Sequence, residues 1–266
     1  MNSSVNPRVG TSVNPVQSNP RPAAPLLEVH DLHVAYGKAE VVHGVSLDVR
    51  AGEFVVMLGR NGAGKSTLLH AVCGLIAKRS GRVVFEGKDL SHASPRAIVQ
   101  AGIVQVLEGH RVFQTLSVED NLLIGTYANH PRGDRSQLER IYTLFPELAD
   151  RRLQMASRLS GGQQQILAVG QGVIGAPKLL ILDEPSGGLA PIVIDRILSV
   201  ATDLCRSGLA ILLVEQLVEK ALRHAHYGYL VETGRIAAHA PTHELQNSEL
   251  LHRVYLGGSA AGAQSA

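Results

Sequence analysis

Cysteine pairs and long apolar runs are both scarce in this chain of 266 residues. Its two cysteines, Cys73 and Cys205, have no partners at metal-ligand spacing, so we predict no disulfide framework and interpret each as a small core residue. No apolar run approaches the roughly 18 residues of a membrane span, and no basic start leads into an apolar signal core. We therefore expect a cytoplasmic protein, and any work at a membrane would need other subunits to supply the membrane part.

An excess of charge is also missing. The 25 Lys and Arg residues and 23 Asp and Glu residues leave a net charge of +2, so the charge balance gives no reason to expect nucleic acid or an anionic membrane surface as a partner. The hydrophobic content of 45% and the charged content of 18% are those of an ordinary globular protein with a sizeable core.

The order of sequence patterns predicts an α/β fold. Residues 1–25 are rich in Asn-Pro, Ser and Pro and are expected to be a disordered leader, and residues 257–266 a mobile tail. Between them, strand patterns alternate with helical ones, which is typical of a mostly parallel sheet, while 94–158 reads as a helical insertion. We predict strands at 26–36, 41–49, 53–58, 80–87, 178–183, 209–214, 229–232 and 235–237, the first two forming a small antiparallel sheet, and helices at 68–76, 192–206, 217–225 and 243–255.

The stretch 59–67 fits the pattern G-x-x-x-x-G-K-[ST], a loop that binds phosphate. It stands between a predicted strand and a predicted helix, as the motif requires. Glycines let backbone N–H groups approach phosphate oxygens, and the helix N-terminus favours negative charge there. Lys65 is placed to reach the β- and γ-phosphates, and the Ser66 hydroxyl to ligate Mg²⁺. The predicted nucleotide-binding residues are Gly59, Arg60, Asn61, Gly62, Ala63, Gly64, Lys65, Ser66 and Thr67.

Two further patterns accompany this loop. Asp183 and Glu184 end a buried apolar strand, where open α/β sheets bind ligands; an acid there can hold Mg²⁺ and its neighbour can activate water, although the pair can also simply cap a strand end. The string Leu-Ser-Gly-Gly-Gln at 159–163 places glycines at a predicted helix start, which makes either a second anion site or a hinge. The anion-site residues would be Ser160, Gly161, Gly162 and Gln163.

With these motifs, the chain from about 26 to 258 resembles the ATP-binding subunits of ABC transporters. The resemblance implies ATP and Mg²⁺ as cofactors, a P-loop NTPase core, Asp183 for Mg²⁺ and Glu184 as the catalytic base. It also implies that Tyr36 stacks on adenine, whereas the residues alone leave an ordinary edge tyrosine equally open. Two such subunits would enclose two ATP molecules, with Ser160 and Gly162 contacting the γ-phosphate held by the partner.

Three positions depart from the general family pattern. Glu108 stands where a glutamine is expected, Ala190 where an aspartate is expected, and Gln216 where a histidine is expected. Together they resemble the LivF-type subunits of branched-chain amino acid importers, although Leu107 replaces the usual proline. Gln216 can still donate a hydrogen bond to phosphate, whereas an ionised Glu108 can bind metal or water but cannot donate. We therefore count Lys65, Glu108, Glu184 and Gln216 as candidate catalytic residues and Ser66, Glu108 and Asp183 as candidate metal ligands.

The subgroup implies several partners: a sister ATPase in a heterodimer, two transmembrane permease subunits and, indirectly, a periplasmic substrate-binding protein. The residues from Glu108 to Phe113 are expected to receive the cytoplasmic helices of the permease, although Phe113 can instead be a core residue. Alternative functions are an importer of urea or short amides and a soluble ABC ATPase that acts on DNA or ribosomes. Soluble ATPases of that kind usually carry coiled-coil insertions, zinc cysteines or two ATPase halves, and this sequence has none of these.

Overall fold

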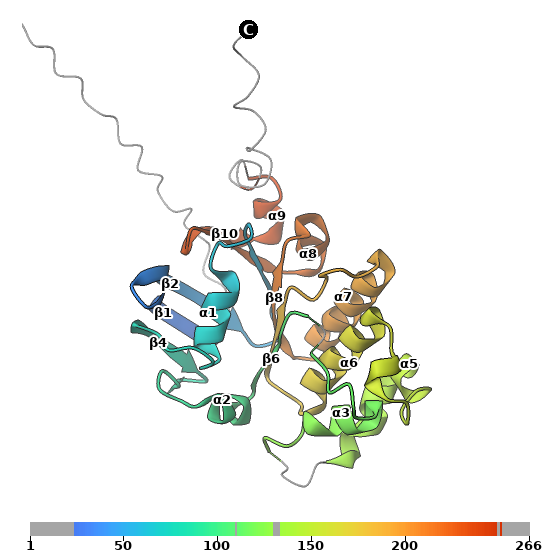
Figure 1. Cartoon of the computed structure of the whole chain (residues 1–266). Helices are drawn as coiled ribbons and strands as arrows, with labels where there is room; N and C mark the ends of the chain where they lie inside the picture. Colours follow the sequence, from blue (N-terminus) through green and yellow to red (C-terminus); the bar gives the residue numbers. More distant parts are fainter. Residues whose placement is uncertain (1–23, 110, 130–133, 249–250, 252–266) are drawn as a thin grey trace, which may run out of the picture.

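The computed structural model describes residues 24–109, 111–129, 134–248 and 251, so the tail predicted at 257–266 and nearly all of the leader lie outside the described residues. Within the described part, the strands form a four-stranded sheet with the order β2-β1-β4-β5 and a six-stranded sheet with the order β10-β9-β3-β8-β7-β6. Figure 1 shows the smaller sheet on one side of the molecule and a group of helices on the other.

The four-stranded sheet is antiparallel and forms from the alternating segments near the start of the chain. In β1 and β2, apolar residues such as Val29, Val34 and Val45 are buried, while polar neighbours face outward. This alternation is what a sheet with one covered face requires, and it confirms the predicted antiparallel β subdomain. The strands are β1 (Pro25–Tyr36), β2 (Ala39–Arg50), β4 (Ser80–Phe85) and β5 (Lys88–Asp89).

The six-stranded sheet is largely parallel: β3 pairs with β8 and β9, and β7 pairs with β8 and β6, all in parallel register. Strands β3, β7 and β8 are buried along their whole length, which explains their continuous apolar sequences. The antiparallel strand β10 completes the sheet as the hairpin partner of β9 around Thr233-Gly234. The strands are β3 (Phe54–Leu58), β6 (Ile103–Val106), β7 (Leu179–Asp183), β8 (Ala210–Glu215), β9 (Tyr227–Glu232) and β10 (Arg235–Pro241).

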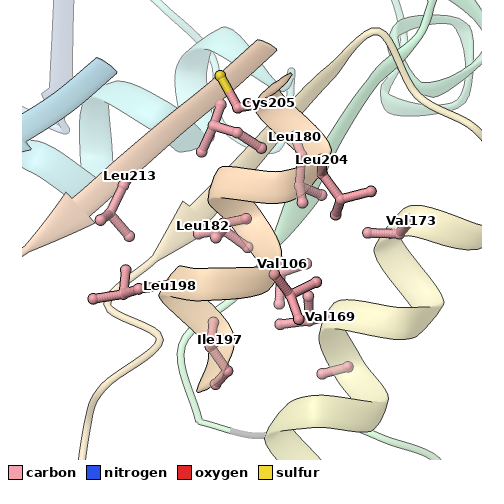
Figure 2. Close-up of a cluster of buried hydrophobic side chains, with 14 of the residues drawn as sticks. Val106, Val169, Val173, Leu180, Leu182, Ile197, Leu198, Leu204, Cys205 and Leu213 are labelled. Carbon is pink, nitrogen blue, oxygen red and sulfur yellow. The ribbon is translucent and has the colours of Figure 1, made fainter. Parts of the chain in front are cut away.

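Successive residues of these strands point into two different cores. Leu180 and Leu182 of β7 join a core with α6 (Gly161–Ile174) and α7 (Pro191–Arg206), whereas Leu179 and Ile181 join a core with α1 (Lys65–Val72) and the smaller sheet. Figure 2 shows the first core, with side chains of α6 and α7 directed at those of β7 and β8. Helices α1 and α6 therefore cover opposite faces of the sheet (Figure 1).

The range 94–158, predicted as a mainly helical insertion, also contains β6, which pairs with β7. Between β6 and residue 158, the regular elements of the described chain are helices and 3₁₀ turns, apart from an isolated bridge between Ser117 and Met155. The remaining helices are α2 (Pro95–Ala101), α3 (Val118–Ile124), α4 (Leu138–Leu144), α5 (Pro146–Ala149), α8 (Val218–His224) and α9 (Thr242–Leu245), with 3₁₀ turns at Arg135–Gln137 and Ala156–Arg158.

Two helix ends also differ from the sequence prediction. Helix α1 ends at Val72 rather than near 76, because the chain turns at Gly74 with a φ of 69°, a conformation that glycine adopts without strain. Helix α9 ends at Leu245, and part of the helix expected at 243–255 lies outside the described residues. None of the described helices is long and apolar enough to cross a membrane.

The core around β7 provides a test of the fold. We predict that Leu182→Ala, which removes a side chain with 0% exposure, lowers the free energy of unfolding by about 2–5 kcal/mol through lost burial and a new cavity. The matched control is Leu153→Ala, since Leu153 is 77% exposed and its truncation should cost less than about 0.5 kcal/mol. Urea unfolding of both variants measures the difference; similar losses would contradict this core.

Candidate functional site

The loop 59–64 joins β3 to α1 and depends on glycine for two separate reasons. Gly62 and Gly64 have φ values of 78° and 97°, in the region that side chains disfavour. At Gly59 the constraint is space, since a Cβ would lie 2.4 Å from the backbone oxygen of Val231. The hairpin that follows β9 supports the loop from outside, with the Gly234 amide donating to the Ala63 oxygen at 2.9 Å. The loop is thus fixed by its own dihedral angles and by β9 and β10.

Lys65 is folded into this loop and is only 4% exposed. Its Nζ donates to the backbone oxygens of Gly59 at 2.9 Å and Arg60 at 3.2 Å, and it lies 3.3 Å from Oε1 of Glu184. The charge of the buried ammonium is therefore balanced by a carboxylate and two carbonyl dipoles. An anion that enters the loop can replace these partners, because ammonium donors rotate freely on a flexible stem.

Asp183 ends β7 and reaches across to α1. Ser66 donates through Oγ to Asp183 Oδ1 at 3.0 Å, while Gln105 donates through Nε2 to Oδ2 at 3.3 Å and His70 Nε2 lies 3.9 Å from Oδ2. Burial raises the pKa of Asp183; the hydrogen bond from Ser66 and the nearby His70 oppose that shift, while Glu184 and Glu108 add to it. A hydroxyl beside a carboxylate is a hard oxygen pair of the kind that Mg²⁺ prefers, so these residues fit that ion.

Glu184 has an unusual backbone for a residue with a side chain, with a φ of 44°. Its amide donates to the Val214 oxygen at 3.0 Å, and its carboxylate lies between Lys65 and Gln216, whose Nε2 donates to Oε2 at 2.5 Å. The side chain of Glu184 therefore has one oxygen on a cation and the other on a neutral donor. This arrangement fixes the carboxylate at the end of β7, beside the loop 59–64.

Glu215 supports this arrangement from the end of β8, although the sequence analysis did not assign it a role. It is 2% exposed and accepts hydrogen bonds from the amide and hydroxyl of Ser186 at 3.1 and 2.8 Å and from the Gln216 amide at 3.0 Å. Burial raises the pKa of Glu215, and these hydrogen bonds oppose that shift. The available signal was an acid at the end of a wholly apolar strand, which needs buried partners.

Gln105 and His70 were missed as well. Gln105 is the only polar residue of β6, and His70 lies one helical turn beyond Ser66 on α1, so both positions carried a weak signal. Glu108 follows β6 as an exposed residue whose charge acts on Asp183. Tyr36 ends β1 at the turn into β2 and is 54% exposed. Its ring is accessible at the edge of the smaller sheet.

The segment 159–163 lies elsewhere. Ser160 caps α6: its Oγ accepts from the Gln163 amide at 3.3 Å, while Oε1 of Gln163 accepts from the Ser160 amide at 3.0 Å. This reciprocal capping explains the serine and the glutamine at that spacing. Gly162 packs against α7, where a Cβ would lie 2.9 Å from Val193. Because α6 and α1 cover opposite faces of the sheet, this segment and the loop 59–67 belong to different layers of one chain.

The structure thus brings together Lys65, Ser66, Asp183, Glu184 and Gln216, and it leaves Ser160, Gly161, Gly162 and Gln163 in a separate layer. The strand order explains the gathering. Strand β8 lies between β3 and β7, so the carboxyl ends of three parallel strands meet at one edge of the sheet. Ligand sites of open α/β sheets form at such edges.

Comparisons with known proteins agree with this arrangement. A family model described as "ABC transporter" matches residues 42–187. The chain is 41% identical to the high-affinity branched-chain amino acid transport ATP-binding protein BraG of Pseudomonas aeruginosa, covering 88% of this chain and 100% of that protein. It is 33% identical to a probable branched-chain amino acid transport ATP-binding protein LivF of Archaeoglobus fulgidus, covering 87% and 99%. The lipopolysaccharide export ATP-binding protein LptB of Escherichia coli is 32% identical, covering 87% and 97%.

Solved structures give the same result for the fold. An ATP-binding cassette of an ABC transporter in its ADP conformation superposes with a TM-score of 0.78 at 26% identity, covering 88% of this chain and all of that one. A nucleotide-free ATP-binding cassette from an ABC transporter superposes with a TM-score of 0.76 at 25% identity, with the same coverage. These structures confirm the predicted α/β fold with a P-loop core.

The buried carboxyl of Asp183 predicts a pH dependence of stability. Its pKa is raised above the ordinary value of 3.8, so the folded state binds the proton more tightly than the unfolded state. Protonation of Asp183 therefore makes its full contribution to the stability of the fold below pH 3.8. This contribution is lost as the pH rises through the pKa of the folded state. Asparagine carries no charge at any pH. We expect Asp183→Asn to be more stable than the parent near neutral pH, and this advantage to shrink on acidification, as measured by urea unfolding across the range; a constant difference would contradict it.

Proposed function

Because the chain belongs to the ABC transporter family as an ATP-binding subunit, we propose that it powers an importer of branched-chain amino acids. As such a subunit it binds and hydrolyses ATP. The observation that carries the proposal is the convergence of Lys65, Ser66, Asp183 and Glu184 at one sheet edge in a chain 41% identical to BraG. The chain would act on the cytoplasmic side of the membrane, where ATP is available.

The contacts at this edge support specific roles. Phosphate would take Lys65 away from the carbonyl oxygens of its own loop, and Ser66 and Asp183 would hold Mg²⁺, with Glu108 near enough to add charge. When bound, Mg²⁺ would supply positive charge that offsets the negative charge of the phosphates. Once Lys65 turns to phosphate, Oε1 of Glu184 is released to accept a proton from the attacking water, while Gln216 keeps holding Oε2. Tyr36 would supply the ring that stacks on adenine.

A second ATPase subunit would complete the site. The capped segment at Ser160 is exposed and lies in a different layer from Lys65, so one chain offers the two halves of a nucleotide site in different places. A second subunit in the opposite orientation would bring its own capped segment, the equivalent of 159–163, to the loop 59–67 of this chain. Ile192, at the start of α7, is 78% exposed and offers an apolar contact on that side. We propose a sister ATPase as this partner.

The permease would dock beside β6. A cavity of about 260 Å³ lies there between β6, the following loop, α3 and α6; Gln105, Arg111 and Gln171 are among the residues that line it. Phe113, next to this loop, is 52% exposed, so it is not a core residue. Asn121 holds the loop in place, with its Oδ1 accepting from the Phe113 amide at 2.8 Å and its Nδ2 donating to the Phe113 oxygen at 2.9 Å. The backbone that carries the exposed ring is therefore held in place, which suits a docking contact.

Reconstitution of the complete transporter tests the proposal that branched-chain amino acids are its cargo. The chain would be assembled with the permease and substrate-binding subunits into proteoliposomes, and ATP-driven uptake of labelled leucine, isoleucine and valine would be compared with that of urea. Competition among the three amino acids, with no uptake of urea, is the expected result. Uptake of urea alone would replace the proposed cargo with urea and leave the ATPase chemistry unchanged.

Glu184→Gln tests the proposed base. The variant keeps the size of the side chain but cannot accept the proton of water, so we expect ATP to bind with unchanged affinity and steady-state hydrolysis to fall about a hundredfold or more. ATP should then hold the subunits together, which size-exclusion chromatography detects. The matched control is Glu219→Gln, an exposed acid on α8, which should hydrolyse ATP like the parent. Undiminished hydrolysis by Glu184→Gln would assign the base elsewhere.

Phe113→Ala tests the docking surface. We expect transport per ATP hydrolysed to fall severalfold in the reconstituted complex, while the free subunit hydrolyses ATP as before, because the exposed ring contributes to docking and not to the ATP site. Leu75→Ala, which truncates an exposed side chain just beyond α1, serves as the control. Uptake and ATPase rate are measured together on the same vesicles. Strictly proportional losses, or a loss of stability alone, would show that Phe113 is only structural.

A further inference from the structure

Gln105 lies at the boundary between two features that are otherwise separate. Its Nε2 donates to Oδ2 of Asp183 at 3.3 Å, and Gln105 is also among the residues that line the cavity beside β6. Strand pairing explains this position, because β6 and β7 are neighbours and Gln105 faces Ile181, two residues before Asp183. Glu108, which stands where the family resemblance leads one to expect a glutamine, lies beyond the end of the strand and is exposed.

The amide of Gln105 has a fixed orientation and an unmatched half. A carboxylate accepts hydrogen bonds only, so the NH₂ group must face Asp183 and the carbonyl oxygen must point elsewhere. That oxygen, Oε1, is buried and has no hydrogen-bond partner among the residues that the structure describes. Leaving a buried acceptor unmatched is energetically costly, so a donor is missing here. Since Oε1 and Nε2 share one carbon, the missing donor would lie beside Asp183.

We propose that Gln105 is a positioning residue for the divalent cation: its NH₂ group orients Asp183, and its Oε1 accepts a hydrogen bond from the cation's water shell. This inference rests on the proposed placement of Mg²⁺ at Ser66 and Asp183. Mg²⁺ usually keeps several of its waters, and each bound water is a strong donor. The chemistry therefore matches both halves of the amide.

The test compares ATP affinity with and without the cation, using a fluorescent, non-hydrolysable ATP analogue in Mg²⁺ or in EDTA. We expect Gln105→Met, which is similar in length but has no amide, to lose about tenfold in the affinity gained from Mg²⁺, the usual effect of removing an outer partner of a metal ligand. Its affinity in EDTA should equal that of the parent. Raising Mg²⁺ should restore ATP turnover, because a defect in cation affinity is overcome by mass action.

Two further variants make the result specific. Gln171→Met removes a glutamine from the same cavity on the α6 side, and its affinities in Mg²⁺ and EDTA should both match the parent. Ser66→Ala should lose the Mg²⁺-dependent gain, because it removes the hydroxyl beside Asp183. Gln105→Leu takes the place of Gln105→Met should the latter lower the unfolding temperature.

The outcomes separate the inference from the proposed function. If Ser66→Ala loses the gain and Gln105→Met keeps it, Gln105 does not position the cation, and the ATPase assignment stands. If Ser66→Ala keeps the gain, the cation lies elsewhere and both the inference and the proposed metal ligands fail. Equal losses of affinity in Mg²⁺ and in EDTA for Gln105→Met would show that Gln105 supports only the fold.

Discussion

The hydrogen bond from Ser66 to Asp183 is the contact on which the site depends, because it joins the first turn of α1 to the end of β7, two segments 117 positions apart in the sequence. It forms only when β3 and β7 lie on either side of β8 in parallel register. The continuous apolar sequences of these strands, buried on both faces, maintain that register. Successive side chains of these strands point into the two cores on opposite faces of the sheet. The packing of both cores therefore also places the polar residues at the carboxyl ends of the strands.

At this edge of the sheet, each buried charged group already has partners within the chain before a ligand binds. Lys65 is paired with Glu184, Asp183 is held by neutral donors, and Glu215 is satisfied by Ser186 and backbone amides. Each of these groups would be costly to bury alone. The pairing of Lys65 with Glu184 has a further consequence: the group that would receive phosphate and the group that would activate water restrain each other until phosphate separates them.

Much of this was predictable from the sequence, and the exceptions have physical causes. The strand–loop–helix order around Lys65 and the acid after β7 are local patterns, so they identified the fold and the members of the polar edge. The position of Gln105 beside Asp183 was not predicted, because it depends on the pairing of β6 with β7, which a four-residue segment does not reveal. Glu215 escaped because its partners come from a turn after another strand. The sequence also could not show that the capped segment at Ser160 lies in a different layer from the loop 59–67.

The three departures from the family pattern have different structural consequences. Gln216 keeps a donor on Glu184, so replacing the expected histidine leaves a hydrogen bond to the proposed base but removes a group that titrates near neutral pH. Ala190 precedes α7 as an N-cap residue without a side-chain cap; Pro191 has no amide hydrogen to satisfy, and the amides of Val193 and Ile194 donate to the Ala190 backbone oxygen at 3.0 and 3.3 Å. Glu108 adds negative charge near Asp183, where a glutamine would add none. More negative charge at this point favours a cation, so the substitution at 108 and the amide of Gln105 act in the same direction on the proposed Mg²⁺ site.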